Sequence, residues 1–388
     1  MEALPPIEPA PAAPPPAGAE ATFPPVGTLT SPPPLAEPLE PPKEEKPALP
    51  EKLGVNKLGG FFQPSALIQF WGQYSHLEGD ASDTTFRLRR VELRAKGEVV
   101  PKISYFINFD LTKVFSTSNT TTQVPVAGSG ATPPGTVAVT QTTVAADRSP
   151  LQDATITYIT DFADVSVGQF KIPVSLEANQ SASKLLFPER SRVVREFADR
   201  RDIGVKLEKK IQDVFFYHVG LYNGQGQNVI DSDRSKDAGL RLEVYPIKGL
   251  LIGGVAYGTI FDRESMVRDR LEADLRLELA NLIVQGEFIA ATTGPAARRQ
   301  KGQGAYGAIA YTFIERLQPV FRAGILDINT NDLPARTVQE SGVQRQFELG
   351  LNYFLRGDSV KFTLAGALYS QEHGLDTSEL TFQSQVVF

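Results

Sequence analysis

Three absences narrow the class of protein to which this 388-residue sequence belongs. It has no cysteine, which excludes a disulfide framework and a thiolate metal site. Its three histidines, His76, His218 and His373, lie far apart in the sequence and indicate no nucleophile triad. No run of about 18 apolar residues occurs, which excludes a helical membrane protein. We therefore expect no enzyme, no cofactor and no metal site.

Proline is unevenly distributed along the chain. More than half of the 29 prolines fall within residues 1–50, with much alanine and glutamate and almost no aromatic residue. Such a segment has too little apolar surface to fold alone, so we expect residues 1–60 to form a disordered, extended tether. Met1 is not followed by a secretory signal pattern, and we expect a mature chain with a starting Met. Residues 61–388 must then carry the folded domain.

From Ser65 onward, apolar residues alternate with polar ones in segments of about ten residues. This pattern is typical of strands with one apolar and one polar face. The predicted strands are 65–75, 85–96, 101–112, 151–161, 164–172, 203–209, 213–222, 238–245, 250–260, 268–279, 281–291, 304–313, 316–327, 345–354, 358–369 and 378–388.

The connections between these strands alternate between tight turns and long loops. The longest loops are 113–150 and 173–202. The Ser/Thr/Val-rich composition of residues 116–147 indicates a flexible or hairpin-like surface loop. An even number of strands, with tight turns at one rim and long loops at the other, predicts an all-β fold: an antiparallel transmembrane β-barrel of about sixteen strands. A soluble β-sandwich also has alternating strands, but here the faces opposite the apolar ones carry Arg, Glu, Asp, Gln and Lys. In a barrel with a water-filled lumen and a lipid-facing exterior, such polar faces line the lumen and the apolar faces contact lipid.

The last predicted strand ends on an aromatic residue. Leu380, Phe382, Val386 and Phe388 share one face of it. This ending resembles the recognition signal that delivers outer-membrane proteins to the barrel-assembly machinery. We therefore interpret Phe388 as an assembly signal.

A second resemblance rests on four short blocks. They are Val167 to Glu177 (Val-Gly-Gln-Phe-Lys-Ile-Pro-Val-Ser-Leu-Glu), Phe187 to Ser191 (Phe-Pro-Glu-Arg-Ser), Arg200 to Val205 (Arg-Arg-Asp-Ile-Gly-Val) and Phe86 to Arg90 (Phe-Arg-Leu-Arg-Arg). Together they resemble the phosphate-selective porin family of Gram-negative outer membranes, including its polyphosphate-preferring members, over residues 60–388.

The resemblance implies a homotrimer of barrels in the outer membrane, surrounded by lipid and lipopolysaccharide, with small anionic solutes as cargo and no role for nucleic acid. It also implies that the loop after the fifth strand, residues 173–202, folds into the lumen and that wall arginines guide anions. Both barrel ends lie at the tight-turn rim, so the Pro-rich extension would be periplasmic, where a cell-wall or other periplasmic partner could bind it.

Arginine suits an anion pore because it stays charged and its planar fork offers two parallel donors. On the second strand the alternation slips by one position between Arg89 and Arg90, which predicts a bulge. This bulge would allow all the arginines of that strand to face the lumen. The expected pore-lining cations are Arg87, Arg89, Arg90, Arg94, Lys171, Lys184, Arg190, Arg192, Arg195, Arg200, Arg201 and Lys206.

Alternatives remain open at this point. Loop 173–202 carries six cations and five carboxylates, a mixed charge that also fits a general small-solute porin. The barrel would alternatively be a structural envelope protein that anchors the periplasmic tether. Acidic residues at 231–237 and 327–332 offer a weak calcium hypothesis, but they lack the central glycine of a calcium loop. The string Gly302 to Gly307 matches a dinucleotide pattern but opens onto a predicted strand, not a helix.

Deleting Phe388, or changing it to Asp, is expected to impair assembly in the membrane with little effect on synthesis, because the terminal aromatic residue lies on the outward face. The measurement is the fraction of protein that migrates as folded barrel in unboiled samples. A normal folded fraction in both variants would show that Phe388 is not an assembly signal.

Overall fold

The structure is a computed structural model that describes residues 60–79, 82–126, 135–146, 150–331, 333–334 and 342–388. Residues 1–59 lie outside the described part, so the disordered extension and its role as a tether stay predictions. Among the described residues, no helix is long and apolar enough to cross a membrane.

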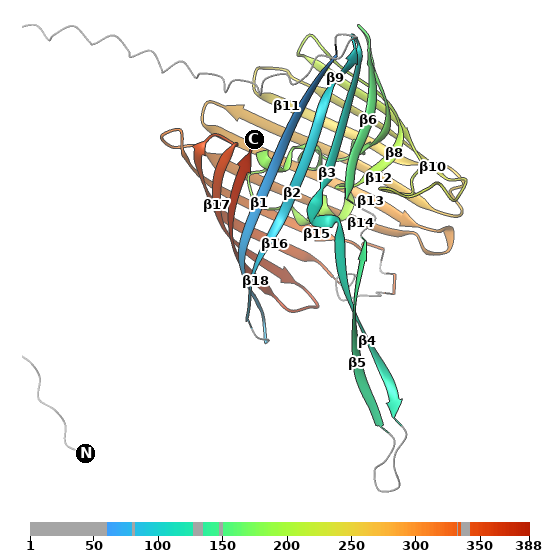
Figure 1. The fold of residues 1–388 in the computed structure, drawn as a ribbon, viewed down its shortest axis with the longest axis vertical. Coiled ribbons are helices and arrows are strands. Elements are labelled where there is room, and N and C mark those ends of the chain that lie inside the picture. Colours follow the sequence, from blue (N-terminus) through green and yellow to red (C-terminus); the bar gives the residue numbers. More distant parts are fainter. Residues whose placement is uncertain (1–59, 80–81, 127–134, 147–149, 332, 335–341) are drawn as a thin grey trace, which may run out of the picture. The chain divides into compact units, whose positions relative to one another are not determined.

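Sixteen antiparallel strands form a closed barrel in the described part of the chain, which confirms the predicted fold class (Figure 1). Each strand pairs with its sequence neighbours in the barrel, and the first and last strands pair to close the sheet. The barrel strands are β1 (Phe61–Leu77), β2 (Ser82–Val100), β3 (Ile103–Asp110), β6 (Leu151–Ile159), β7 (Asp164–Lys171), β8 (Arg201–Ile211), β9 (Phe215–Tyr222), β10 (Lys236–Val244), β11 (Leu250–Phe261), β12 (Val267–Leu279), β13 (Leu282–Gly294), β14 (Gln300–Tyr311), β15 (Leu317–Asp327), β16 (Gln344–Arg356), β17 (Val360–Gln371) and β18 (Thr377–Val387).

The remaining elements lie in the connections. β4 (Phe115–Val126) and β5 (Gly135–Ala146) form a two-stranded hairpin, which agrees with the hairpin-like interpretation of residues 116–147. The described helices are short: three 3₁₀ turns and two α-helices. They are η1 (Leu111–Lys113), α1 (Leu176–Asn179), η2 (Ala182–Lys184), α2 (Arg192–Phe197) and η3 (Ala296–Arg298).

The tight turns have the geometry that antiparallel hairpins require. Gln212 and Asp213, which join β8 to β9, have φ values of 48° and 56°. Ile314 and Glu315, between β14 and β15, have φ values of 48° and 58°. Two consecutive positive φ values are typical of the type I′ turn, whose twist matches that of the flanking strands. The alternation of tight turns with long loops follows the predicted order.

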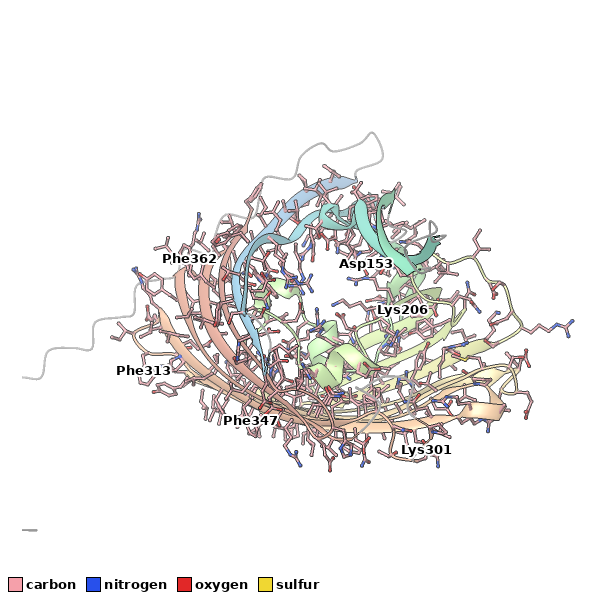
Figure 2. The ribbon with its side chains drawn as sticks, turned by 90° about the horizontal axis from the view of Figure 1, so that it is seen from below. Asp153, Lys206, Lys301, Phe313, Phe347 and Phe362 are labelled. Carbon is pink, nitrogen blue, oxygen red and sulfur yellow. The ribbon has the colours of Figure 1, made fainter. Side chains whose placement is uncertain are left out.

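The polarity of the barrel is inverted relative to that of a soluble domain. Phe86 and Leu349 are 74% and 66% exposed, whereas Arg322 and Lys361 are 0% and 2% exposed. Figure 2 shows the same division, since Phe313, Phe347 and Phe362 point outward and Asp153 and Lys206 point inward. An apolar exterior around a polar interior is the arrangement of a barrel that lies in lipid. It excludes the β-sandwich alternative.

The predicted bulge of β2 is present. The pairing of β1 with β2 passes from Gln69 opposite Arg90 to Phe70 opposite Leu88, so Arg89 is the extra residue. Phe70 and Leu88 lie on the outer face, and Arg89 and Arg90 both face the barrel interior. The bulge thus places consecutive arginines on the same side of the sheet.

The seam that closes the barrel includes the last residue of the chain. The amide of Phe388 donates to the Ala66 carbonyl over 3.1 Å, and the Ala66 amide donates to the Phe388 carbonyl over 2.7 Å. The Phe388 side chain is exposed. The terminal residue therefore completes the ladder between β1 and β18 while its ring stays outside.

The apolar core lies inside the barrel, between one wall and the segment 172–200, which we call the constriction loop. Val193, Val194 and Phe197 of α2 are buried, and this helix packs against β13, β14 and β15. The helices of this loop lie within the ring of strands in Figure 2. Burial of these apolar side chains fixes the loop to one side of the lumen.

Glycines on β14 allow α2 to approach the wall closely. A Cβ atom on Gly302 would lie 2.9 Å from the Phe197 ring, and one on Gly304 would lie 2.8 Å from a Val193 methyl group. Gly302 and Gly304 of the Gly302 to Gly307 string therefore serve helix packing. No observation in this part of the structure supports a phosphate cradle.

Gly304→Ala is expected to lower the free energy of unfolding by about 1–3 kcal/mol and to loosen α2, because the added methyl group overpacks the contact with Val193. Gly307→Ala on the same strand is the control, since a Cβ there meets nothing within 4 Å. Thermal unfolding in detergent measures both variants. Equal unfolding temperatures for the two would contradict the close-packing account.

Candidate functional site: the constriction loop and its cavity

The constriction loop folds around two capped helices. Ser175 precedes α1, and its hydroxyl accepts a hydrogen bond from the Ala178 amide over 3.0 Å. Ser191 precedes α2, and its hydroxyl accepts one from the Val194 amide over 3.3 Å. Serine satisfies the free amides at a helix start, which explains where each helix begins.

Arg322 on β15 is the most deeply buried cation of the loop's attachment site. Its Nη1 lies 2.9 Å from Glu177 Oε1, and its Nη2 donates to the Glu189 carbonyl over 2.9 Å. Glu348 on β16 forms a second ion pair with it, and the Phe187 ring lies 4.5 Å from the guanidinium carbon. A single buried guanidinium thus joins two wall strands to both halves of the loop.

Further polar side chains of the wall hold the backbone of the loop. Lys361 Nζ donates to the carbonyls of Ser183 and Leu185, each over 2.9 Å. Asn352 Nδ2 donates to the Leu186 carbonyl over 2.9 Å. These contacts satisfy loop carbonyls that are shielded from bulk water, which is the condition for an irregular segment to be stable inside a barrel.

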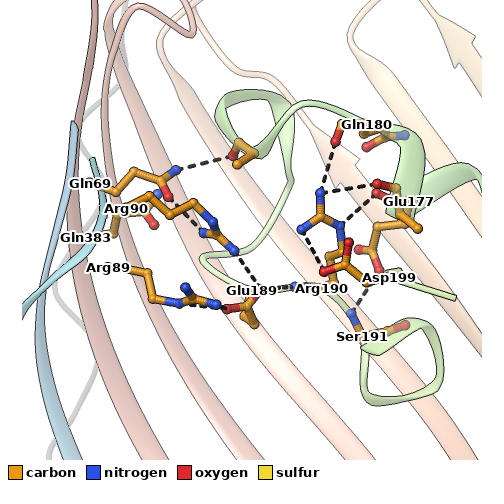
Figure 3. Close-up of polar contacts among 12 residues, drawn as sticks. Gln69, Arg89, Arg90, Glu177, Gln180, Glu189, Arg190, Ser191, Asp199 and Gln383 are labelled. Atoms are coloured by element: carbon orange, nitrogen blue, oxygen red, sulfur yellow. Dashed lines mark hydrogen bonds and ion pairs between the residues drawn. The ribbon is translucent and has the colours of Figure 1, made fainter. Parts of the chain in front are cut away.

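Two arginines of β2, which follows β17 around the wall after β18 and β1, also reach the loop (Figure 3). Arg89 Nε donates to Glu189 Oε2 over 2.9 Å, and Arg90 Nη2 lies 2.9 Å from Glu189 Oε1. Burial alone would raise the pKa of Glu189, but Arg90 and Arg89 hold that pKa well below its usual range. Glu189 therefore stays ionised at physiological pH.

A cavity of about 620 Å³ lies between the loop and the wall from β2 to β10. Asp153 and Lys206 point into this space in Figure 2. Nine Lys or Arg side chains and six Asp or Glu side chains border it. The cations are Arg89, Arg90, Arg94, Lys113, Lys171, Arg190, Arg201, Lys206 and Arg241.

Several of the predicted cations border this cavity next to a carboxylate. Arg201 pairs with Asp153 over 3.0 Å and Lys206 with Glu208 over 2.6 Å. Arg94 pairs with its neighbour Glu92. The structure thus places most of these cations in local ion pairs at the cavity wall.

Lys171 and Arg190 also border the cavity, but their donors serve the constriction loop. Arg190 donates to the carbonyls of Glu177 and Gln180 over 3.1 and 3.0 Å and lies 3.3 Å from Asp199 (Figure 3). Lys171 donates to the carbonyls of Ala178 and Gln180. Both side chains stabilise the turn between α1 and η2.

The remaining predicted cations do not border this cavity. Arg87 lies 4.9 Å from the centre of the Trp71 ring, and Arg192 lies 4.0 Å from that of Tyr369 on β17. Arg192 Nη1 also donates to Gln344 Oε1 on β16 over 2.9 Å. Lys184, Arg195 and Arg200 are exposed on the loop. Arg200 instead borders a smaller cavity of about 200 Å³.

The acidic loop residues that suggested calcium have other partners. Asp231 pairs with Lys236 over 2.7 Å, and Asp237 accepts from Tyr257 and Arg268, each over 2.9 Å. Within the described ranges, no three His, Asp or Glu side chains are grouped so that they could hold a metal ion.

Sequence reasoning missed three residues on which this site depends: Glu189, Arg322 and Lys361. From the sequence, Glu189 was only one of the five carboxylates counted in loop 173–202. Arg322 and Lys361 occupy inward positions of their strands, opposite the exposed residues Phe321 and Leu364. The alternation alone would have placed them in the lumen, yet it carries no information on their partners.

Residues 68–250 match the family model of phosphate-selective porins O and P, which confirms the resemblance over the first half of the barrel. Among curated proteins, no sequence matches the chain.

Solved structures with the same fold are distant in sequence. An anion-selective porin from Comamonas acidovorans is 11% identical, covers 85% of this chain and 100% of its own, and has a TM-score of 0.58. Salmonella typhi OmpF is 9% identical, covers 84% of this chain and 98% of its own, and has a TM-score of 0.56. Vibrio cholerae OmpT in its trimer form is also 9% identical, covers 85% of this chain and 99% of its own, and has a TM-score of 0.53.

Arg322→Gln is expected to release the constriction loop and to cost about 3–5 kcal/mol of stability, because buried Glu177 and Glu348 would lose their cation. The single-channel conductance should rise as the loop leaves the lumen. Arg316→Gln, at an exposed turn position, removes the same charge as a control. A conductance and an unfolding temperature equal to those of the control would contradict the role given to Arg322.

Proposed function

We propose that this outer-membrane porin, whose residues 68–250 match the phosphate-selective family, prefers anions and admits them through the cavity beside its constriction loop. The observation that carries the proposal is the lining of that cavity, where nine cationic side chains outnumber six carboxylates. Fixed charge acts most strongly at the narrowest part of a pore, where a solute has shed part of its water.

The strength of attraction is set by how the cations are paired. Two opposite charges 4 Å apart attract by about 4 kcal/mol at an effective dielectric constant near 20. Neighbouring carboxylates oppose that attraction at Arg94, Arg201 and Lys206. Lys113 also borders the cavity and forms no ion pair with any described residue. Several weak sites favour entry of an anion without trapping it, as conduction requires.

A general porin for small polar solutes is the second candidate function. The observation that favours it is that most cavity cations have a carboxylate next to them, so opposite charges face the same space. Both candidates are passive channels, and neither requires catalysis. They differ in the sign of the ion preference, which can be measured directly.

The outer surface suggests how the barrel is assembled and surrounded. Exposed apolar side chains would contact outer-membrane lipid and lipopolysaccharide, and Phe388 at the seam would engage the barrel-assembly machinery. The OmpT relative that is described as a trimer supports a homotrimer for this chain. We therefore propose lipid, lipopolysaccharide, the barrel-assembly machinery and further copies of this chain as its partners.

Changing Arg89 and Arg90 together to Gln is expected to shift the reversal potential in a KCl gradient toward cations, because Glu189 then remains without its two cations. Block of chloride current by added phosphate should weaken. Lys301→Gln with Arg345→Gln is the control, since both residues are exposed and neither borders the cavity. If the two double variants gave the same reversal potential, the general-porin function would be the better account.

A further inference from the structure

The pair of arginines on β2 already holds an anion, which is the carboxylate of Glu189. One carboxylate oxygen accepts from Arg89, and the other lies 2.9 Å from Arg90 Nη2. Two guanidinium groups that each take one oxygen form the arrangement that recognises carboxylates and phosphates. The carboxylate occupies the place that a permeating oxyanion would take.

This two-arginine site is held in shape by the wall as well as by Glu189. Arg90 Nη1 donates to Gln69 Oε1 over 2.8 Å, and Gln69 in turn is bonded to Gln385 on β18. The guanidinium carbon of Arg89 lies 5.4 Å from the centre of the Trp71 ring. The positions of both cations therefore have support that does not depend on the carboxylate.

The loop, likewise, does not depend on this carboxylate for its attachment. The backbone carbonyl of Glu189 is bound by Arg322, and neighbouring loop carbonyls are bound by Lys361 and Asn352. If the Glu189 side chain turned away from the arginines, it would also give up its contact with the Arg190 amide at 3.2 Å, but these wall contacts of the loop would remain.

We propose that Glu189 is a specificity-determining residue, a tethered carboxylate that competes with permeating anions for Arg89 and Arg90. This inference rests on the proposed anion preference of the cavity. Two cations against one carboxylate leave a single positive charge, which still attracts an incoming anion. An oxyanion with two oxygens and at least two negative charges, such as hydrogen phosphate, displaces the carboxylate more readily than chloride does.

The test compares Glu189→Gln with Glu196→Gln, using KCl and inorganic phosphate as probes. Glu196 lies on the same loop, is exposed and has no side-chain contact with Arg89 or Arg90. Glu189→Gln should lower the phosphate concentration that half-blocks chloride current by about tenfold. This is the change expected if the Glu189 carboxylate weakens phosphate binding by a factor of about ten. Glu196→Gln should leave that concentration unchanged.

Three outcomes would overturn the inference. One is equal phosphate block in the two variants. Another is a single-channel conductance of Glu189→Gln as large as that of Arg322→Gln, which would show that Glu189 anchors the loop. The third is an undiminished effect of Glu189→Gln when Arg89 and Arg90 are already Gln. A wild-type pore that prefers cations would instead refute the proposed function itself, so the two failures are distinguishable.

Discussion

The constraint on which this structure depends is that a sheet in lipid must pair all of its backbone polar groups. A closed barrel meets it because the sheet has no free edge. Here closure is completed at the last residue, where Phe388 exchanges two hydrogen bonds with Ala66. Alternation along each strand then directs apolar side chains to the lipid and polar ones to the lumen. The polar interior follows from the apolar exterior.

That polar interior both holds the constriction loop and leaves a charged passage beside it. The wall from β13 to β15 receives the apolar side of α2, while Arg322 and Lys361 bind loop carboxylate and carbonyl groups. Farther around the wall, beyond β18 and β1, β2 contributes the consecutive arginines that its bulge brings to one side. The loop therefore contacts a continuous arc of the wall that includes β17, β18, β1 and β2, and the cavity lies between the loop and β2 to β10.

Much of the fold could be predicted from the sequence, because alternation is a local property. The segment around Phe347, Leu349 and Leu351 alternates so regularly that β16 is predicted within a few residues of its ends. The bulge at Arg89 was predictable for the same reason, since the polar face shifts by one residue. The terminal strand and the tight turns are equally local signals.

The partners of the charged residues could not be predicted in this way. Arg89 and Glu189 are 100 positions apart, and Arg322 and Glu177 are 145 apart. A count of loop charges gives their sum, but it does not show which carboxylate neutralises which arginine. That pairing depends on how the loop crosses the lumen, which places Arg192 against Tyr369 of β17 and outside the cavity lining.

The central claim is that cations at the cavity outweigh the negative charge of the whole chain, −6. The zero-current potential of the wild-type pore across a KCl gradient tests it most directly. Anion preference predicts that chloride flows down its gradient faster than potassium, so the dilute side becomes negative. A dilute side that becomes positive would show a cation-preferring pore and would contradict this account.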